Sequence, residues 1–162
     1  MEKEVLITQQ IVSAWQGQIK RIDALIDKLS DEQLLNHVAP GRNRGVYLLG
    51  HLATVSDMML PLLGLGNMLK PEMQAIFVSV PDNAVKDLPS LAELRKYWKD
   101  VNDTLNGHFE KMKPEDWLAP HTAVSEEDFK KQPHRNKLSI ILSRTSHHTY
   151  HFGQLAFLQS AN

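Results

Sequence analysis

Apolar residues recur at spacings of three and four along most of the chain, and this periodicity predicts helices. The first such segment extends from Val5 to Leu29, with charged and polar residues between the apolar ones. A helix turns by about 100° per residue, so this spacing places the apolar positions on one face. Ser30 and Asp31 end the first predicted helix. The stripe consists of Val5, Thr8, Val12, Trp15, Ile19, Ile22, Ile26 and Leu29.

The same periodicity predicts three more helices. The second begins near residues 43–46 and extends to about residues 64–66, and we expect Pro61 to kink it or end it early. The third begins at Ser90-Leu-Ala-Glu93, which has the form of a capping box. The fourth extends from about Asn136 to Ser160.

Two long connections separate the predicted helices. Residues 71–89 contain three prolines and a short apolar piece, which we expect to form one or two helical turns. Residues 113–135 contain three more prolines and are long for a loop without regular structure. Because no segment shows the alternation of a strand, we predict an all-α fold in which residues 1–162 form a single four-helix bundle domain.

Composition narrows the class of protein without naming a function. Apolar residues make up 42% and charged residues 23% of the 162 residues, which is typical of a globular domain. The net charge of -1 favours neither nucleic acid nor an anionic membrane as a partner. No apolar run has the length of a membrane span, and the first residues do not resemble a secretory signal, so we expect a cytoplasmic protein. Because the chain has no cysteine, any metal ligands must be nitrogen or oxygen atoms.

Three histidines lie on inward-facing positions of the predicted helices. His51 is in line with Leu48 and Val55 on the apolar stripe of the second helix. His147 and His151 are four residues apart on the fourth helix and point the same way, whereas His148 points about 100° away. A buried imidazole without a partner costs about 1–3 kcal/mol, and a shared zinc, nickel, copper or iron ion would remove that cost. Three nitrogen ligands would leave a coordination position open, as in catalytic zinc sites.

A second interpretation of such histidines needs no metal. A histidine on an apolar stripe is more often a hydrogen-bonded core residue, and we interpret His108 in this way. Two histidines four apart in a helix are also common without a metal. We expect His37, His121 and His134, which lie in loop-like segments near prolines, to be exposed.

Four neighbouring positions could support the site or only the fold. Gln154 lies one turn beyond His151 and could form a hydrogen bond either to a ligand or to another helix. Tyr47 could reach the site, but packing is its simpler role. We interpret Gly153 as a point of close approach between helices and expect Asp57, some 120° from His51, to face solvent.

Two sequence patches resemble the DinB / YfiT-like superfamily. They are Gly50-His51-Leu52, with the segment that leads to it from Pro40, and His147-x-x-x-His151-x-Gly153-Gln154. The resemblance implies a bundle of crossed, up-down-down-up topology and a divalent metal, often nickel or zinc. The implied ligands are His51, His147 and His151.

The chain departs from the family pattern at two places. Phe152 stands where the family commonly has a basic residue, and this change concerns packing or a dimer surface. Arg44-Gly45 stands where an aromatic and a small hydroxyl residue usually start the second helix.

The resemblance also implies two kinds of function. One is a metal-dependent thiol S-transferase or hydrolase, which would act on a small-molecule electrophile. Without a cysteine, the chain would need a low-molecular-weight thiol as cosubstrate, and no residue is assigned as catalytic. The alternative is a non-catalytic, metal-stabilised homodimer that acts as a binding or stress-associated module. The apolar residues on several faces of the fourth helix suit either a dimer interface or a central position in the bundle. They are Leu142, Phe152, Ala156 and Phe157.

Overall fold

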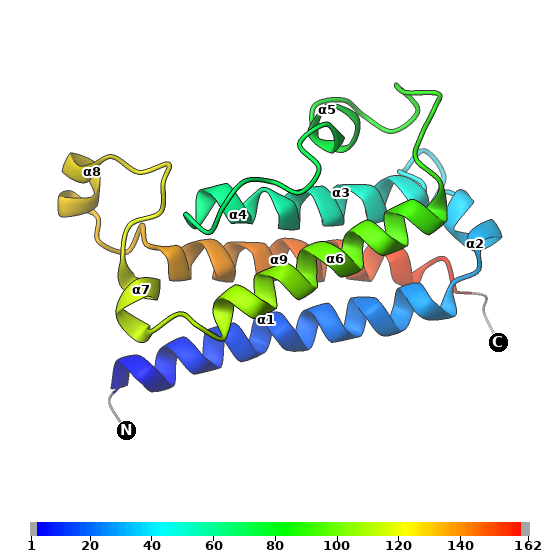
Figure 1. The fold of residues 1–162 in the computed structure, drawn as a ribbon. Coiled ribbons are helices and arrows are strands. Elements are labelled where there is room, and N and C mark those ends of the chain that lie inside the picture. The colour runs from blue at the N-terminus through cyan, green and yellow to red at the C-terminus, as the bar shows by residue number, and fades with distance from the viewer. Residues whose placement is uncertain (1–2, 160–162) are drawn as a thin grey trace.

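Residues 3–159 are described by a computed structural model, and regular structure in them is entirely helical. The all-α prediction is therefore confirmed for this part of the chain. Figure 1 shows the order of the helices along the chain. They are α1 (Lys3–Lys28), α2 (Asp31–Leu35), α3 (Gly45–Asp57), α4 (Met59–Leu62), α5 (Met73–Phe77), α6 (Leu91–Phe109), α7 (Pro114–Leu118), α8 (Glu126–Lys131) and α9 (Lys137–Ala156).

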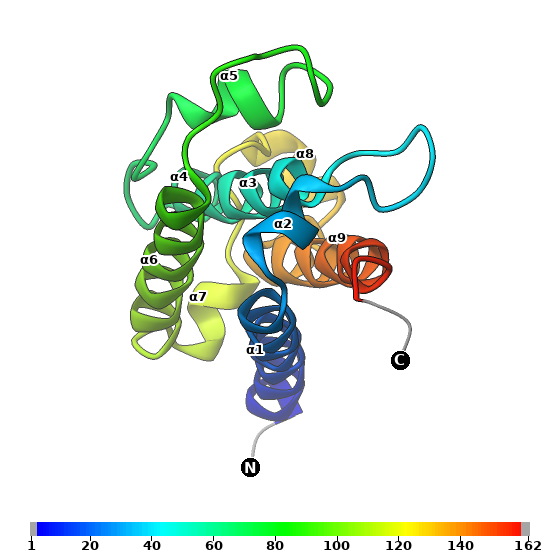
Figure 2. The same ribbon diagram turned by 90° about the vertical axis from the view of Figure 1, so that its right-hand side faces the viewer.

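Four long helices, α1, α3, α6 and α9, lie side by side around a common core (Figures 1 and 2). Helix α3 packs against α6 and α9, and α1 packs against the same two helices. The colours in Figure 1 show that α1 and α9 run in one direction and that α3 and α6 run in the other. Helices α3 and α9 are therefore antiparallel, and residues about a hundred positions apart in the sequence come together.

Helix starts follow local capping chemistry. Ser30 caps α2 together with Gln33, and Ser90 caps α6 together with Glu93, so the predicted capping box is confirmed. In α9 the side chain of Asn136 accepts a hydrogen bond from the backbone N–H of Ser139. These contacts satisfy N–H groups that have no partner within the helix.

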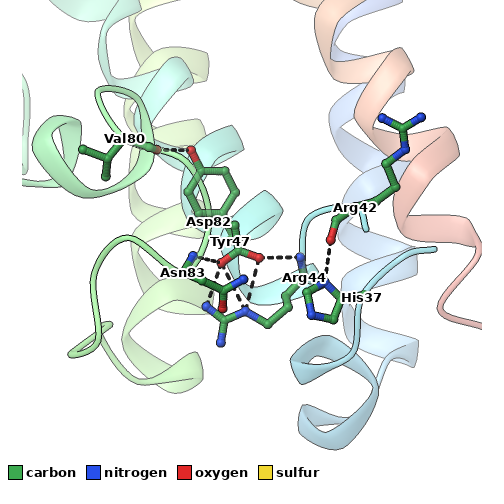
Figure 3. Close-up of polar contacts among 7 residues, drawn as sticks. All are labelled: His37, Arg42, Arg44, Tyr47, Val80, Asp82 and Asn83. Atoms are coloured by element: carbon green, nitrogen blue, oxygen red, sulfur yellow. Dashed lines mark hydrogen bonds and ion pairs between the residues drawn. The ribbon is translucent and has the colours of Figure 1, made fainter. Parts of the chain in front are cut away.

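Helix α3 begins without a capping side chain of its own. The Asp82 carboxylate, from the connection after α5, instead accepts hydrogen bonds from the backbone and guanidinium of Arg44 (Figure 3). Gly45 is required at the first position because a Cβ there would lie 2.5 Å from Leu158 and 2.9 Å from the carbonyl oxygen of Leu34. A negative charge at this end also complements the helix dipole.

Pro61 interrupts the second predicted helix, as expected. Helix α3 ends at Asp57, four residues before Pro61, and α4 starts at Met59. Proline has no N–H to donate to the carbonyl group four residues earlier, so the regular hydrogen bonding stops there.

The two connections contain short helices. Helix α5 packs on α3, where Phe77 is fully buried, and this agrees with the predicted helical turns. The second connection, which is long for a loop without regular structure and for which no helix was predicted, contains α7 and α8. Within residues 3–159 no helix is both long and apolar enough to cross a membrane.

Candidate metal centre

His51 projects from the middle of α3 towards His147 and His151 of α9. The Nε2 atom of His147 lies 3.1 Å from the Nε2 atoms of both His51 and His151. One ring nitrogen from each histidine lies within 4.8 Å of the others. All three side chains are partly buried, so the cluster is sheltered but not fully enclosed.

The outer nitrogens of two of these rings are held by acceptors. The Nδ1 atom of His51 lies 2.7 Å from the carbonyl oxygen of Phe77, and that of His151 lies 2.7 Å from Oε1 of Gln154. Because these oxygens can only accept, each Nδ1 atom carries the hydrogen. The lone pairs of both Nε2 atoms therefore point towards His147.

The neutral ring of His147 carries one N–H hydrogen, which cannot complete all the hydrogen bonds of the cluster. If Nε2 of His147 carries it, that hydrogen serves one of two contacts of equal length, and its buried Nδ1 acceptor has no partner. If Nδ1 carries it, three lone pairs converge. Either way the cluster has more lone pairs than hydrogens, and a cation placed between the nitrogens would correct the excess.

Electrostatics also keeps these imidazoles neutral. Burial, together with the neighbouring rings of His151 and His51, lowers the pKa of His147 to about 4. Burial likewise lowers the pKa of His51 and of His151 below the ordinary range. Proton binding is therefore opposed, and at neutral pH the side chains have the charge state that metal ligation requires.

The spacing of the nitrogens fits a single transition-metal ion. Zinc binds imidazole at about 2.0–2.1 Å, so two nitrogens on one ion are about 2.9 Å apart at a right angle and about 3.4 Å apart at the tetrahedral angle. The two separations that involve His147, both 3.1 Å, fall between these values. The residues present therefore fit the metal that the sequence resemblance implies.

His148 is separate from this cluster, in agreement with its helical phase. It is fully buried, with Nδ1 donating to the carbonyl oxygen of Arg144 at 2.8 Å and Nε2 facing Oγ of Ser56 at 3.0 Å. Burial lowers the pKa of His148 to about 3. We expected this ring to point towards the flank of the helix, but it belongs to the polar part of the core.

Gln154 and Tyr47 have distinct supporting roles. Gln154 accepts a hydrogen bond from His151, a candidate metal ligand, which is one of the two roles predicted for it. Tyr47 is buried, and its hydroxyl donates to the carbonyl oxygen of Val80 at 2.7 Å (Figure 3). Its ring stacks on that of His51 at a centroid distance of 6.2 Å. Tyr47 thus packs, as favoured, and helps to orient His51 through its ring.

Two predictions about acidic and small residues are wrong. Asp57 is fully buried and accepts hydrogen bonds from the backbone of Leu69 and Lys70 and from the hydroxyl of Tyr97, because the chain after α4 folds back over it. Gly153 is exposed, and a Cβ there would have no neighbour within 4 Å. Neither residue therefore plays the part expected from the sequence.

The remaining histidines lie outside the cluster. His37 and His134 are exposed, as expected. His121 is instead buried, and its Nδ1 accepts a hydrogen bond from the backbone N–H of Ala123. His108 is partly buried near the end of α6 and is not part of the cluster.

Two groups near the cluster were not anticipated. The carbonyl oxygen of Phe77 is a backbone atom, and no side-chain pattern indicates its position. Arg144 lies on α9 three residues before His147, and its charge contributes to lowering the pKa of His51 and His147. Its spacing of three from His147 was a signal that could have identified it.

Comparison with known proteins gives one match. Residues 14–155 match the sequence model of the DinB superfamily. The matched range includes all three histidines of the cluster. A search of curated proteins finds no match to the chain.

Proposed function

Because the chain belongs to the DinB superfamily, we propose that His51, His147 and His151 bind a divalent metal ion, zinc or nickel, on a four-helix bundle of the crossed type. The observation that carries the proposal is the convergence of three neutral imidazoles with too few hydrogens for their contacts. Phe77 and Gln154 support the proposal because both fix the tautomer that directs Nε2 inwards.

The proposed activity is transfer of a thiol to a small electrophile, or hydrolysis. When bound, the ion would supply Lewis acidity that activates a thiol or a water molecule at neutral pH. Three nitrogen ligands would leave room for such a molecule. The chain itself orients the imidazoles and limits access of bulk water, and with no cysteine it would take the thiol from solution.

Metal analysis tests the proposed site directly. Protein purified without a histidine tag and incubated with zinc or nickel should retain one ion per chain after gel filtration. His51→Ala, His147→Ala and His151→Ala should each abolish this binding, whereas the exposed His134→Ala should not change it. Retention of metal by the triple variant would contradict the site.

Activity is tested separately with the metal-loaded protein. Chloro- and epoxide electrophiles should be consumed in the presence of a low-molecular-weight bacterial thiol, and ester substrates test for hydrolysis. The His147→Ala variant is the control. Equal activity in that variant would exclude a mechanism based on the three histidines.

A homodimeric binding module is the second candidate function. One exposed stripe consists of Leu142 and Tyr150 of α9 and Phe157, the residue that follows α9, which are 56%, 64% and 78% exposed. Large apolar side chains clustered on one face favour burial against a partner. A Leu142→Glu/Phe157→Glu variant should convert a dimer to a monomer in light scattering, and Leu35→Glu, at an exposed apolar site on α2, is the matched control. A wild-type protein that is monomeric would rule this candidate out.

A further inference from the structure

A small pocket lies between α3, α4, α5 and α9, one helical turn along α9 from the candidate metal centre. Its volume is about 270 Å³, and it is lined by Met58 at the end of α3, Leu62 of α4, Gln74 of α5 and Arg144 of α9. Arg144 precedes His147 by one helical turn, which is roughly 4.5 Å along the axis. Arg144 is therefore the lining residue that connects the pocket to the helix carrying His147 and His151.

Arg144 is the one charged residue among those lining the pocket, and within residues 3–159 its side chain has neither an ion pair nor a hydrogen bond. Its Nε atom is buried without a partner. Burial lowers the pKa of Arg144, and no carboxylate counters that effect. A guanidinium in this position is costly for the fold because its lost hydration is not replaced.

Other partly buried arginines in this protein are paired. Arg44 forms an ion pair with Asp82 at 2.7 Å (Figure 3). Arg95 donates to the carbonyl oxygens of Ile26 and Leu29 at 2.7 and 2.8 Å. The unpaired state of Arg144 is therefore unusual in this fold, and it coincides with the pocket.

The rest of the lining is suited to an apolar body. Four of the seven lining residues are apolar: Met58, Pro61, Leu62 and Met68. The hydroxyl of Thr122 already donates to the carbonyl oxygen of Pro61, at 3.0 Å. A planar guanidinium binds a carboxylate through two parallel hydrogen bonds, and the volume is at the small end for ligand pockets.

We propose that this pocket binds a small carboxylate with a short apolar chain, with its carboxylate on Arg144 and its chain against Met58, Leu62 and Met68. This ligand is the substrate or thiol cosubstrate of the proposed function, and only that role rests on the proposed function. Binding to Arg144 itself requires no metal.

Titration calorimetry with hexanoate, hexanamide and hexyl phosphate tests the proposal, on both metal-free and zinc-loaded protein. Hexanoate should bind in both states. Arg144→Met should weaken hexanoate binding roughly ten- to hundredfold, because a charged hydrogen-bonding pair is lost. Arg144→Lys should give an intermediate loss, and Arg21→Met, at an exposed position of α1, should give none.

A second variant keeps the test decisive if Arg144→Met does not fold. Gln74 is exposed and lines the pocket, so Gln74→Trp should block hexanoate without removing the charge. Equal affinity for hexanoate and hexanamide, tighter binding of hexyl phosphate, or full hexanoate binding by Gln74→Trp would each overturn the proposal.

The two proposals fail in different ways. Loss of hexanoate binding in Arg144→Met together with an absence of zinc binding by the wild type would support the pocket and contradict the metal centre. Stoichiometric zinc binding without hexanoate binding would support the metal centre and contradict the pocket. Because Arg144 is not a proposed metal ligand, Arg144→Met should retain its zinc.

Discussion

Gln154 controls the orientation of His151 from outside the cluster. Its Oε1 accepts the Nδ1 hydrogen of His151, and its Nε2 donates to the hydroxyl of Tyr150 at 3.2 Å. The amide is thus held on both sides. Its effect on the candidate metal centre is to select the tautomer and to limit rotation of one ring.

We expect Gln154→Leu to weaken zinc binding about ten- to hundredfold, because the acceptor that orients His151 is lost. Competition with a chromophoric chelator measures the affinity. Gln154→Glu is the matched control, because a carboxylate still accepts the hydrogen bond. Equal affinities in both variants would show that Gln154 does not act through His151.

His148 should make the metal-free protein sensitive to acid. Its pKa is about 3 in the folded chain and about 6.5 when unfolded, so the unfolded state binds protons first as the pH falls. The free energy of unfolding should therefore decrease between about pH 6.5 and about pH 3, by up to about 1.4 kcal/mol per pH unit from this group. The stability that it contributes is fully present only above about pH 6.5.

Urea unfolding in the presence of a chelator, at about pH 7.5 and about pH 5, measures this dependence. His148→Asn should reduce the slope, although the variant is less stable at every pH. His134→Gln, at an exposed position, should keep the wild-type slope. An unchanged slope in His148→Asn would assign the acid sensitivity to other groups.

At the scale of elements, α5 is held on α3 at Gly50. A Cβ at this position would collide with the ring of Phe77, whose carbonyl oxygen binds His51. The absence of a side chain thus lets α5 approach α3 closely enough to support the cluster. The ion pair between Arg44 and Asp82 holds the connection after α5 against the start of α3 (Figure 3).

Substitution of two glycines should have opposite effects. Gly50→Ala should destabilise the protein by about 1–3 kcal/mol, since overpacking must displace Phe77, and should also weaken zinc binding. Gly153→Ala, with open space around it, should stabilise α9 by about 0.5–1 kcal/mol and leave zinc binding unchanged. Urea unfolding and chelator competition measure both effects. A loss of stability in Gly153→Ala would mean that a partner covers this face.

Helix starts and the interruption before Pro61 were the most predictable part of the fold, because they depend on local chemistry. The end of the fourth helix was not, since α9 ends at Ala156 and the predicted end near Ser160 lies outside the described residues. The capping box at Ser90 and the interruption before Pro61 act within a few residues of the chain. Burial beside those elements was less predictable. Asp57 is buried because a segment twelve or more residues later returns to it, which helical phase cannot indicate.

At the scale of the whole molecule, the histidine cluster joins two helices that run in opposite directions. His51 belongs to α3 and the other two histidines belong to α9, so a shared ion would cross-link segments separated by 96 residues. Such a site exists only in the folded chain. A bound metal should therefore stabilise the whole fold.

We expect zinc at a hundredfold excess over its dissociation constant to raise the free energy of unfolding by about 2.7 kcal/mol. For a chain of this length, that corresponds to an increase in Tm of about 5–10 °C. Scanning calorimetry with and without zinc measures it. His147→Ala should show no shift, and an equal shift in that variant would place the stabilising ion elsewhere.

The sequence by itself determined the long helices and the inward positions of His51, His147 and His151, because periodicity and spacing are properties of a single helix. Only the tertiary structure decided what surrounds them. The carbonyl oxygen of Phe77, the buried Asp57 and the unpaired Arg144 depend on contacts between segments far apart in the chain. Those contacts form when the apolar faces pack together. That packing places the acceptors that fix the histidine tautomers, and it also forms the pocket lined by Arg144.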